Sequence, residues 1–237
     1  MKHINLSFAA CGFLGIYHLG AASALCNHGR KLLKDVKACA GASAGSLVAS
    51  VLLTAPQKIE ECNKFTYDFA EEIRRQSFGA LTPGYDLMAR LRSGVESILP
   101  ANAHELAHGR LHVSITNTRT GQNCLVSSFP CREDLVKRWV DGSFTNSLPV
   151  LPVGRTVTIS PFSGRLDISP QDEGRLHFYG SVTNQEALCV FLSQLSMANL
   201  VRLKRALFPP SRRTMESLYR RGFDDASRFL LKENWFE

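Results

Sequence analysis

The sequence predicts an α/β fold in which a mostly parallel central sheet is flanked by helices. Short apolar segments typical of buried strands alternate along the chain with longer segments of helical periodicity, as in βαβ units. The 237 residues, of which 44% are hydrophobic and 21% charged, are enough for one large domain with its own core. A glycine-containing turn follows each of the first two predicted strands, where the chain must reverse from strand to helix.

The N-terminal segment allows two interpretations. Residues Ile4–Asn27 contain no Lys, Arg, Asp or Glu, and Ala22-Ser23-Ala24 resembles a signal-peptidase site, so a secretory or membrane segment is one alternative. Glycines and polar residues interrupt this apolar run, which favours a buried β-loop-α unit in a cytoplasmic protein. The expected elements are a strand, a turn and a helix at Ile4–Phe8, Ala9–Gly15 and Ile16–His28.

The remaining elements follow from hydrophobic periodicity and from proline and glycine positions. Further strands are expected at Asp35–Ala40, Leu111–Thr116, Asn123–Phe129 and Arg155–Ser160, with a turn at Asn117–Gly121. Helices are expected at Ser46–Ala55, Pro56–Arg75, Tyr85–Leu99, Arg132–Trp139, Glu186–Leu207 and Ser211–Leu231. We therefore divide the chain into an α/β domain over residues 4–165 and a helical C-terminal extension over residues 166–237.

The charge of the chain restricts its partners. A formal net charge of +7 favours association with acidic surfaces such as nucleic acid or anionic lipid. No helix-turn-helix, zinc or RNA-binding signature accompanies the basic C-terminal helices, so nucleic-acid binding is not expected. The last helix combines an apolar stripe with many arginines, and it either packs on the core or lies on a membrane or droplet surface. Seven scattered cysteines without a C-x-x-C pair indicate a reducing compartment and no zinc site.

One motif indicates nucleophilic catalysis. Gly41-Ala42-Ser43-Ala44-Gly45 matches G-x-S-x-G between a predicted strand and a predicted apolar helix, which is the context of a nucleophile elbow. Gly41 and Gly45 would remove Cβ clashes at such a sharp turn, and Ser43 would lie at the positive end of the helix. The alternative is an ordinary glycine-rich turn in which Ser43 caps the helix.

A serine nucleophile requires a base and an oxyanion hole. The elbow comes after only two strands, and the order Ser-acid-His of the α/β-hydrolases is not met in the core, so a triad is not expected. Asp141, in an Asp-Gly pair, is the candidate base of a Ser-Asp dyad, although Asp-Gly is also a common turn dipeptide. The loop Cys11–Gly15 is the candidate oxyanion hole, with a simple strand-to-helix turn as the alternative.

These motifs, in this order, resemble the patatin-like phospholipase family. The segment Ser7–Gly20 is similar to the adiponutrin and triglyceride-lipase branch of that family. The resemblance implies a three-layer patatin fold with Ser43 as the nucleophile, Asp141 as the base and the amides of Gly12 and Phe13 as the oxyanion hole. It further implies hydrolysis of acylglycerols, phospholipids or retinyl esters, acyl transfer between acylglycerols, and attachment to lipid droplets or membranes from the cytoplasm. It implies no metal and no organic cofactor.

The sequence departs from the family pattern before Asp141. Family members have a helix and further strand residues ahead of the Asp-Gly pair, whereas here Arg132–Arg138 runs directly into Trp139. A segment between Phe129 and Asp141 is therefore expected to be missing, as in an alternatively spliced chain. The alternative function is a shortened, catalytically impaired form that binds a lipid surface or a partner protein.

Overall fold

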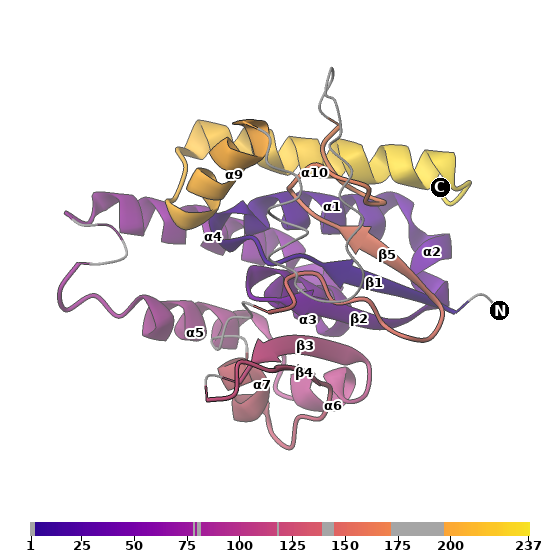
Figure 1. The fold of residues 1–237 in the computed structure, drawn as a ribbon, viewed down its shortest axis with the longest axis horizontal. Helices are drawn as coiled ribbons and strands as arrows, with labels where there is room; N and C mark the ends of the chain where they lie inside the picture. The colour runs from indigo at the N-terminus through magenta and orange to yellow at the C-terminus, as the bar shows by residue number, and fades with distance from the viewer. Residues whose placement is uncertain (1–2, 78, 80–81, 118, 139–144, 172–196) are drawn as a thin grey trace.

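The fold is built on a five-stranded sheet. A computed structural model describes residues 3–77, 79, 82–117, 119–138, 145–171 and 197–237. The strands are β1 (Ile4–Phe8), β2 (Val36–Ala42), β3 (Leu111–Thr116), β4 (Asn123–Val126) and β5 (Arg155–Ile159), in the order β4-β3-β2-β1-β5. All neighbouring pairs are parallel except β3 and β4, which form a hairpin (Figure 1). This arrangement confirms the predicted mostly parallel sheet.

Helices connect and cover these strands. They are α1 (Gly15–His28), α2 (Arg30–Asp35), α3 (Ala44–Thr54), α4 (Ile59–Arg75), α5 (Leu87–Ile98), α6 (Ala103–Ala107), α7 (Arg132–Arg138), α9 (Met197–Leu207) and α10 (Arg212–Lys232), with short 3-10 helices η1 (Gly12–Leu14) and η2 (Pro56–Lys58). Residues 4–28 form β1, η1 and α1, so the β-loop-α interpretation of the N-terminal segment is confirmed. The sequence did not predict α6, and the first part of the expected helix Glu186–Leu207 lies outside the described residues.

One predicted strand is shorter than expected. The expected strand Asn123–Phe129 ends at Val126, because β4 pairs with β3 alone and Val126 lies opposite Val113, near the start of that strand. Farther along, the carbonyl of Ser127 accepts a hydrogen bond from the amide of Gly109, in the turn before β3. The regular pairing of β4 therefore stops before the start of β3, and Ser127 contacts the turn before that strand instead.

The two faces of β1 have different neighbours. Ile4, Leu6 and Phe8 point into the main hydrophobic core, which includes residues of α1 and α3. On the opposite face, Asn5 donates a hydrogen bond to the carbonyl of Val153 (2.7 Å) and Ser7 donates one to the carbonyl of Pro149 (2.5 Å). The segment that follows residue 144 is therefore held along β1 by polar side chains of the sheet.

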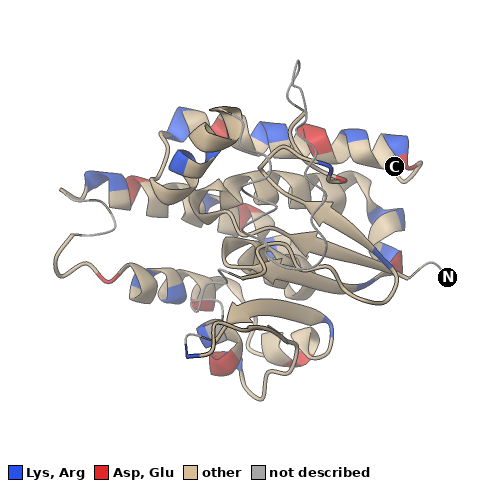
Figure 2. Cartoon of the chain, in the orientation of Figure 1, with Lys and Arg blue, Asp and Glu red and all other residues tan. Residues whose placement is uncertain are grey.

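The C-terminal helix packs closely on α1. A Cβ at Gly20 would lie 2.0 Å from the carbonyl oxygen of Tyr219, and one at Gly222 would lie 2.0 Å from that of Tyr17. The buried hydroxyl of Tyr17 donates a hydrogen bond of 2.6 Å to Asp225, which also contacts Arg228. The apolar stripe of α10 enters the main core with Met215, Ala226, Phe229 and Leu230. Of the two interpretations of this helix, the structure shows the packed one, with Lys and Arg on its remaining surface (Figure 2).

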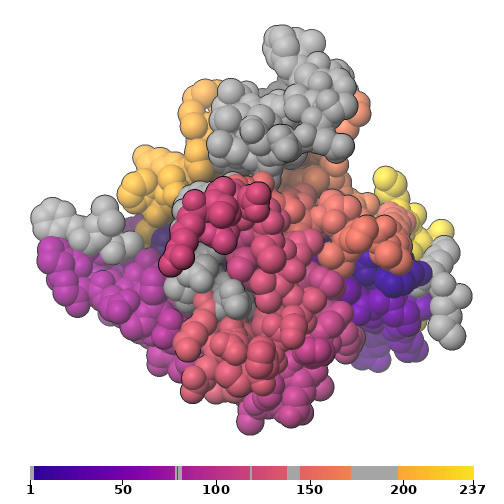
Figure 3. Space-filling model, turned by 60° about the horizontal axis from the view of Figure 1, so that its bottom comes forward, coloured from indigo at the N-terminus to yellow at the C-terminus, as the bar shows by residue number. Residues whose placement is uncertain are grey.

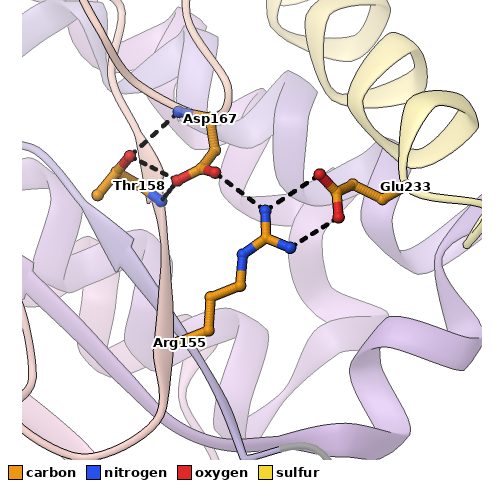
Figure 4. Close-up of polar contacts among 4 residues, drawn as sticks. All are labelled: Arg155, Thr158, Asp167 and Glu233. Carbon is orange, nitrogen blue, oxygen red and sulfur yellow. Dashed lines mark hydrogen bonds and ion pairs between the residues drawn. The ribbon is translucent and has the colours of Figure 1, made fainter.

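An ion-pair network joins the end of α10 to the sheet. Arg155 of β5 contacts Asp167 (3.2 Å) and Glu233 (2.7 Å), and Asp167 accepts hydrogen bonds from the amide and hydroxyl of Thr158 (Figure 4). Both ends of α10 therefore contact the rest of the protein, since Arg212 pairs with Glu71 at the other end. The predicted domain division at residue 166 stays a prediction.

Candidate active site

Ser43 occupies a strained turn between β2 and α3. Its backbone angles are φ 51° and ψ −129°, and it is one of two described non-glycine residues with positive φ. Such a conformation is unfavourable for a residue with a Cβ and persists only where the surrounding structure enforces it. The helix begins at once with Ala44, two residues earlier than the sequence predicts. This is the strand-turn-helix geometry of a nucleophile elbow.

The glycines on either side of Ser43 allow this turn. A Cβ at Gly41 would lie 2.6 Å from the amide nitrogen of Ser46, and one at Gly45 would lie 2.3 Å from the carbonyl oxygen of Phe8. Contacts this short with backbone atoms cannot be relieved by moving a side chain. The helix can therefore start directly above the end of β1 because both positions lack a Cβ.

The side chain of Ser43 does not cap the helix. Ser43 is the N-cap residue of α3, but its hydroxyl makes no capping hydrogen bond. The carbonyl of Ser43 instead accepts hydrogen bonds from the hydroxyl (2.6 Å) and the amide (2.9 Å) of Ser46. The structure therefore does not show the capping bond that the alternative interpretation gives to the Ser43 side chain.

The loop after β1 lies next to this serine. Gly12 adopts a positive φ of 51° at the start of η1, and both Gly12 and Phe13 line the same cavity as Ser43. Within the described part of the chain, the amides of Gly12 and Phe13 have no hydrogen-bond acceptor, whereas the next amide, that of Leu14, bonds to the carbonyl of Cys11. Two unpaired N–H groups and the Ser43 hydroxyl therefore share one cavity.

The cavity is apolar and has a volume of about 320 Å³, at the lower end of the usual range for ligand pockets. Its walls come from α3, α4 and α5, chiefly through Leu47, Val51, Phe65, Phe69, Leu91 and Val95. The sequence shows several of these residues as helical apolar stripes but does not distinguish a cavity wall from solid core. A chamber of this kind suits a hydrocarbon chain.

The candidate base Asp141 lies outside the described residues, together with residues 139–144. No Asp, Glu or His is found among the described residues that line the cavity. The chain is described again from Thr145, whose hydroxyl lies 3.0 Å from that of Thr116, at the end of β3. The carbonyl of Asn146 then accepts a hydrogen bond of 2.8 Å from Ser114, which pairs in register with Ala42, the residue before Ser43.

A buried histidine supports the strand end beneath the elbow. The Nε2 atom of His18 lies 2.9 Å from the carbonyl oxygen of Ala9, so Nε2 carries the proton and donates it. Its Nδ1 atom is buried without a hydrogen-bond partner. Burial lowers the pKa of His18 from 6.5 to about 4, and the bond to Ala9 opposes this shift only partly. The sequence analysis did not single out His18, because a histidine in an apolar helix carries no distinguishing signal.

Comparison with known proteins identifies the family. The family model described as Patatin-like phospholipase matches residues 6–135, more than half of the chain. The chain belongs to the patatin-like phospholipase family. Within the described residues of this patatin-like protein, no helix is long and apolar enough to cross a membrane, and no group of three or more His, Cys, Asp or Glu could hold a metal ion.

Individual relatives support the same assignment. The chain is 70% identical to human Patatin-like phospholipase domain-containing protein 4, covering 100% of both chains. It is 35% identical to mouse Patatin-like phospholipase domain-containing protein 2 and 33% identical to the mouse 1-acylglycerol-3-phosphate O-acyltransferase Pnpla3. In both comparisons 95% of this chain is covered, against 50% and 58% of the relatives, so the chain spans about half the length of each. Membership of this family supports lipid-ester hydrolysis as the activity.

The alignment with the human relative also bears on the missing segment. It is 259 positions long, 22 more than the 237 residues of this chain, so this patatin-like protein lacks about 22 positions. The family match ends at residue 135, before Asp141. The shortfall of about 22 positions agrees with the prediction that a segment is missing, and its place between Phe129 and Asp141 stays a prediction.

Proposed function

We propose that this protein is a serine lipid hydrolase that uses Ser43 and Asp141 as a catalytic dyad and forms a covalent acyl-enzyme. The observation that carries the proposal is the geometry of the cavity. The uncapped Ser43 hydroxyl and the unpaired amides of Gly12 and Phe13 line one apolar chamber. Nucleophilic acyl transfer requires a nucleophile next to hydrogen-bond donors that face the developing oxyanion.

In the proposed reaction, the acyl chain lies in the cavity and the ester carbonyl lies between Ser43 and η1. The Ser43 oxygen attacks the carbonyl carbon while its proton passes to the Asp141 carboxylate, and the amides of Gly12 and Phe13 bind the oxyanion. Collapse of this intermediate breaks the ester bond, and the departing alcohol takes the proton from Asp141. Water or the hydroxyl of an acylglycerol then attacks the acyl-enzyme, and its proton passes through Asp141 to the released Ser43.

The anchoring of residues 145–147 supports Asp141 as the base. Ser147 accepts a hydrogen bond from the amide of Ala10 (2.7 Å), and Asn146 accepts one from Ser114, beside Ala42. Four residue steps separate Asp141 from Thr145, so the connecting chain can span at most about 14 Å. This anchoring supports the proposal that Asp141 acts at the edge of the sheet at which Ser43 lies.

The substrates we propose are acylglycerols, phospholipids or retinyl esters, with transfer of the acyl group to another acylglycerol as a second outcome. The mouse relative named as a 1-acylglycerol-3-phosphate O-acyltransferase supports the use of an acyl acceptor other than water. Because such substrates reside in membranes and droplets, we further propose that the protein acts there as a peripheral protein on the cytoplasmic side.

The test is hydrolysis of an emulsified long-chain ester by the wild type and by Ser43→Ala, with Ser77→Ala as a control at an exposed serine. We expect Ser43→Ala to lose at least about a thousandfold in kcat, since a nucleophile has no substitute in this mechanism. Asp141→Asn is expected to lose a comparable factor, and Ser77→Ala should equal the wild type. Equal fatty-acid release by the wild type and Ser43→Ala would reject the proposal.

A second function follows from the roughly 22 missing positions. If they supported Asp141, the chain would retain the cavity but hydrolyse esters slowly, acting as a lipid-surface or partner-binding protein. Labelling of Ser43 by a fluorophosphonate separates the two functions, because the probe reacts with an activated serine. Strong labelling favours the hydrolase, and vesicle binding without labelling favours the non-catalytic protein.

A further inference from the structure

A second pocket, away from Ser43, is strongly cationic. It lies between α9 and the first turns of α10 and has a volume of about 320 Å³. Four of its lining residues are the arginines Arg202, Arg205, Arg213 and Arg221, and the hydroxyl residues Thr214 and Ser217 contribute to its wall. No Asp or Glu lines it among the described residues.

Two arginines of this pocket, Arg205 and Arg213, differ from other arginines of the same region. Arg212 contacts Glu71 and Glu216, and Arg228 contacts Asp225. In the described part of the chain, Arg205 and Arg213 have neither a hydrogen bond nor an ion pair. Two unpaired guanidinium groups in one pocket repel each other unless an anion lies between them, and guanidinium is well suited to bind phosphate in a bidentate manner.

The start of α10 strengthens the preference for an anion. This helix is 21 residues long and begins at Arg212, so the positive end of its dipole lies at the pocket. Arg202 is held in place on the α9 side, because its Nη1 atom donates hydrogen bonds to Asn199 (2.8 Å) and Ser163 (3.1 Å). The pocket thus combines a fixed arginine, two unpaired arginines and a helix N-terminus.

Helix α9 lies at the surface of the molecule (Figure 3), and several of its large apolar side chains are exposed to solvent. Asn199 and Arg202 of this helix are buried, whereas Met197, Leu207 and the next residue, Phe208, are 69%, 62% and 64% exposed. Lys204 and Arg205 are exposed as well. Leu200 and Val201 are exposed on the same helix. A helix with exposed apolar side chains beside a cationic pocket fits a lipid surface that contains anionic lipid. Such a surface has an apolar interior and a negatively charged headgroup layer.

We propose that α9 and the arginine pocket dock the protein on a membrane that contains anionic phospholipid, with the phosphate of one lipid bound between Arg205 and Arg213. Leu207 and Phe208 insert among the acyl chains of the same surface. Helix α9 packs against η1: a Cβ at Gly12 would lie 2.2 Å from the carbonyl oxygen of Ala206. Docking through α9 therefore places the lipid surface next to η1. The inference deepens the proposed function and rests on it for the reason why a lipid surface is needed.

The test is co-sedimentation with vesicles of phosphatidylcholine alone and of phosphatidylcholine with phosphatidic acid. Arg205→Gln/Arg213→Gln is compared with Arg30→Gln/Arg119→Gln, which removes the same charge at exposed sites outside the pocket. We expect the pocket variant to lose roughly thirtyfold in apparent affinity for the anionic vesicles, on the basis of about fivefold for each basic residue near such a surface. The control variant should stay within about twofold of the wild type, because surface charges outside a site are screened.

Two further measurements separate this inference from its rivals. Leu207→Ser/Phe208→Ser should weaken binding to both kinds of vesicle, and soluble glycerol 3-phosphate should compete only weakly. Equal losses in the pocket and control variants, or strong binding of glycerol 3-phosphate without vesicle binding, would overturn the inference. Hydrolysis of a soluble short-chain ester should be unchanged in the pocket variant. If Ser43→Ala hydrolyses esters as well as the wild type while vesicle binding is intact, the proposed function is rejected and the inference about docking is not.

Discussion

At Ser43 the backbone, rather than the side chain, holds the conformation that exposes the hydroxyl. A positive φ at a residue with a Cβ costs on the order of 1–3 kcal/mol, and the close packing of Gly41 and Gly45 against neighbouring backbone enforces it. Beneath this turn, the carbonyl of Ala9 contacts both His18 and the glycine at position 45. The elbow therefore depends on groups that take no part in the chemistry.

The buried His18 is expected to make the stability of the protein depend on pH. Its pKa is lowered to about 4 in the folded protein, so between pH 6.5 and 4 the unfolded chain binds more protons than the folded one. The free energy of unfolding contributed by His18 is fully present above pH 6.5 and falls as the pH drops, by up to about 3 kcal/mol at pH 4. Denaturant unfolding at several pH values measures this loss in the wild type and in His18→Gln, which lacks the titrating ring.

The control for this prediction is His112→Gln. His112 is half-buried, and its pKa is also lowered by burial. We expect this variant to keep most of the pH dependence of the wild type, whereas His18→Gln should lose most of it between pH 6.5 and 4. Parallel stability curves for the wild type and His18→Gln would contradict the burial of a neutral His18.

Among the elements, the pair α1 and α10 is packed most tightly. Gly20 and Gly222 let the two backbones approach, and the buried hydrogen bond from Tyr17 to Asp225 crosses the interface. Because η1 leads directly into α1, this packing fixes the helix that follows the candidate oxyanion loop. A helix near the C-terminus thus supports residues at the N-terminal end of the site.

Gly222→Ala tests the close contact of these helices. Helix propensity alone predicts that alanine stabilises a helix interior by about 1 kcal/mol relative to glycine. Here the new Cβ would lie 2.0 Å from the carbonyl oxygen of Tyr17, so the helices must separate, and we expect a net destabilisation of about 2 kcal/mol. Thermal and denaturant unfolding measure the change. Asp224→Ala, at an exposed position of the same helix, should stay within about 0.5 kcal/mol of the wild type, and a stabilised Gly222→Ala would refute the tight packing.

The whole molecule combines an apolar cavity, an exposed apolar helix and a net charge of +7. The cavity lies on one side of η1, and α9 contacts the same loop through Ala206. This arrangement is suited to a protein whose substrate and surroundings are both lipid. This chain lacks about 22 positions relative to the human relative, and we predict that they fall in the stretch before Asp141.

Restoring those positions tests their role. A chimaera in which the stretch between Phe129 and Asp141 is replaced by the corresponding stretch of the human relative should hydrolyse the emulsified ester at least about tenfold faster, because a better-positioned base lowers the barrier to proton transfer. Vesicle binding should be unchanged, since the chimaera keeps α9 and the arginine pocket of this chain. Equal activity of the two proteins would show that this chain positions its base without the segment.

The sequence by itself determined the parallel sheet, the order of the elements and the position of the elbow. These follow from local properties, namely the periodicity of apolar residues and the glycines of Gly41–Gly45, which act over a few neighbouring residues. Only the tertiary structure decided that the Ser43 hydroxyl makes no cap, that Phe65 and Leu91 form a cavity wall, and that α9 turns its apolar residues outward. These properties depend on contacts between residues far apart in the chain, which periodicity does not encode.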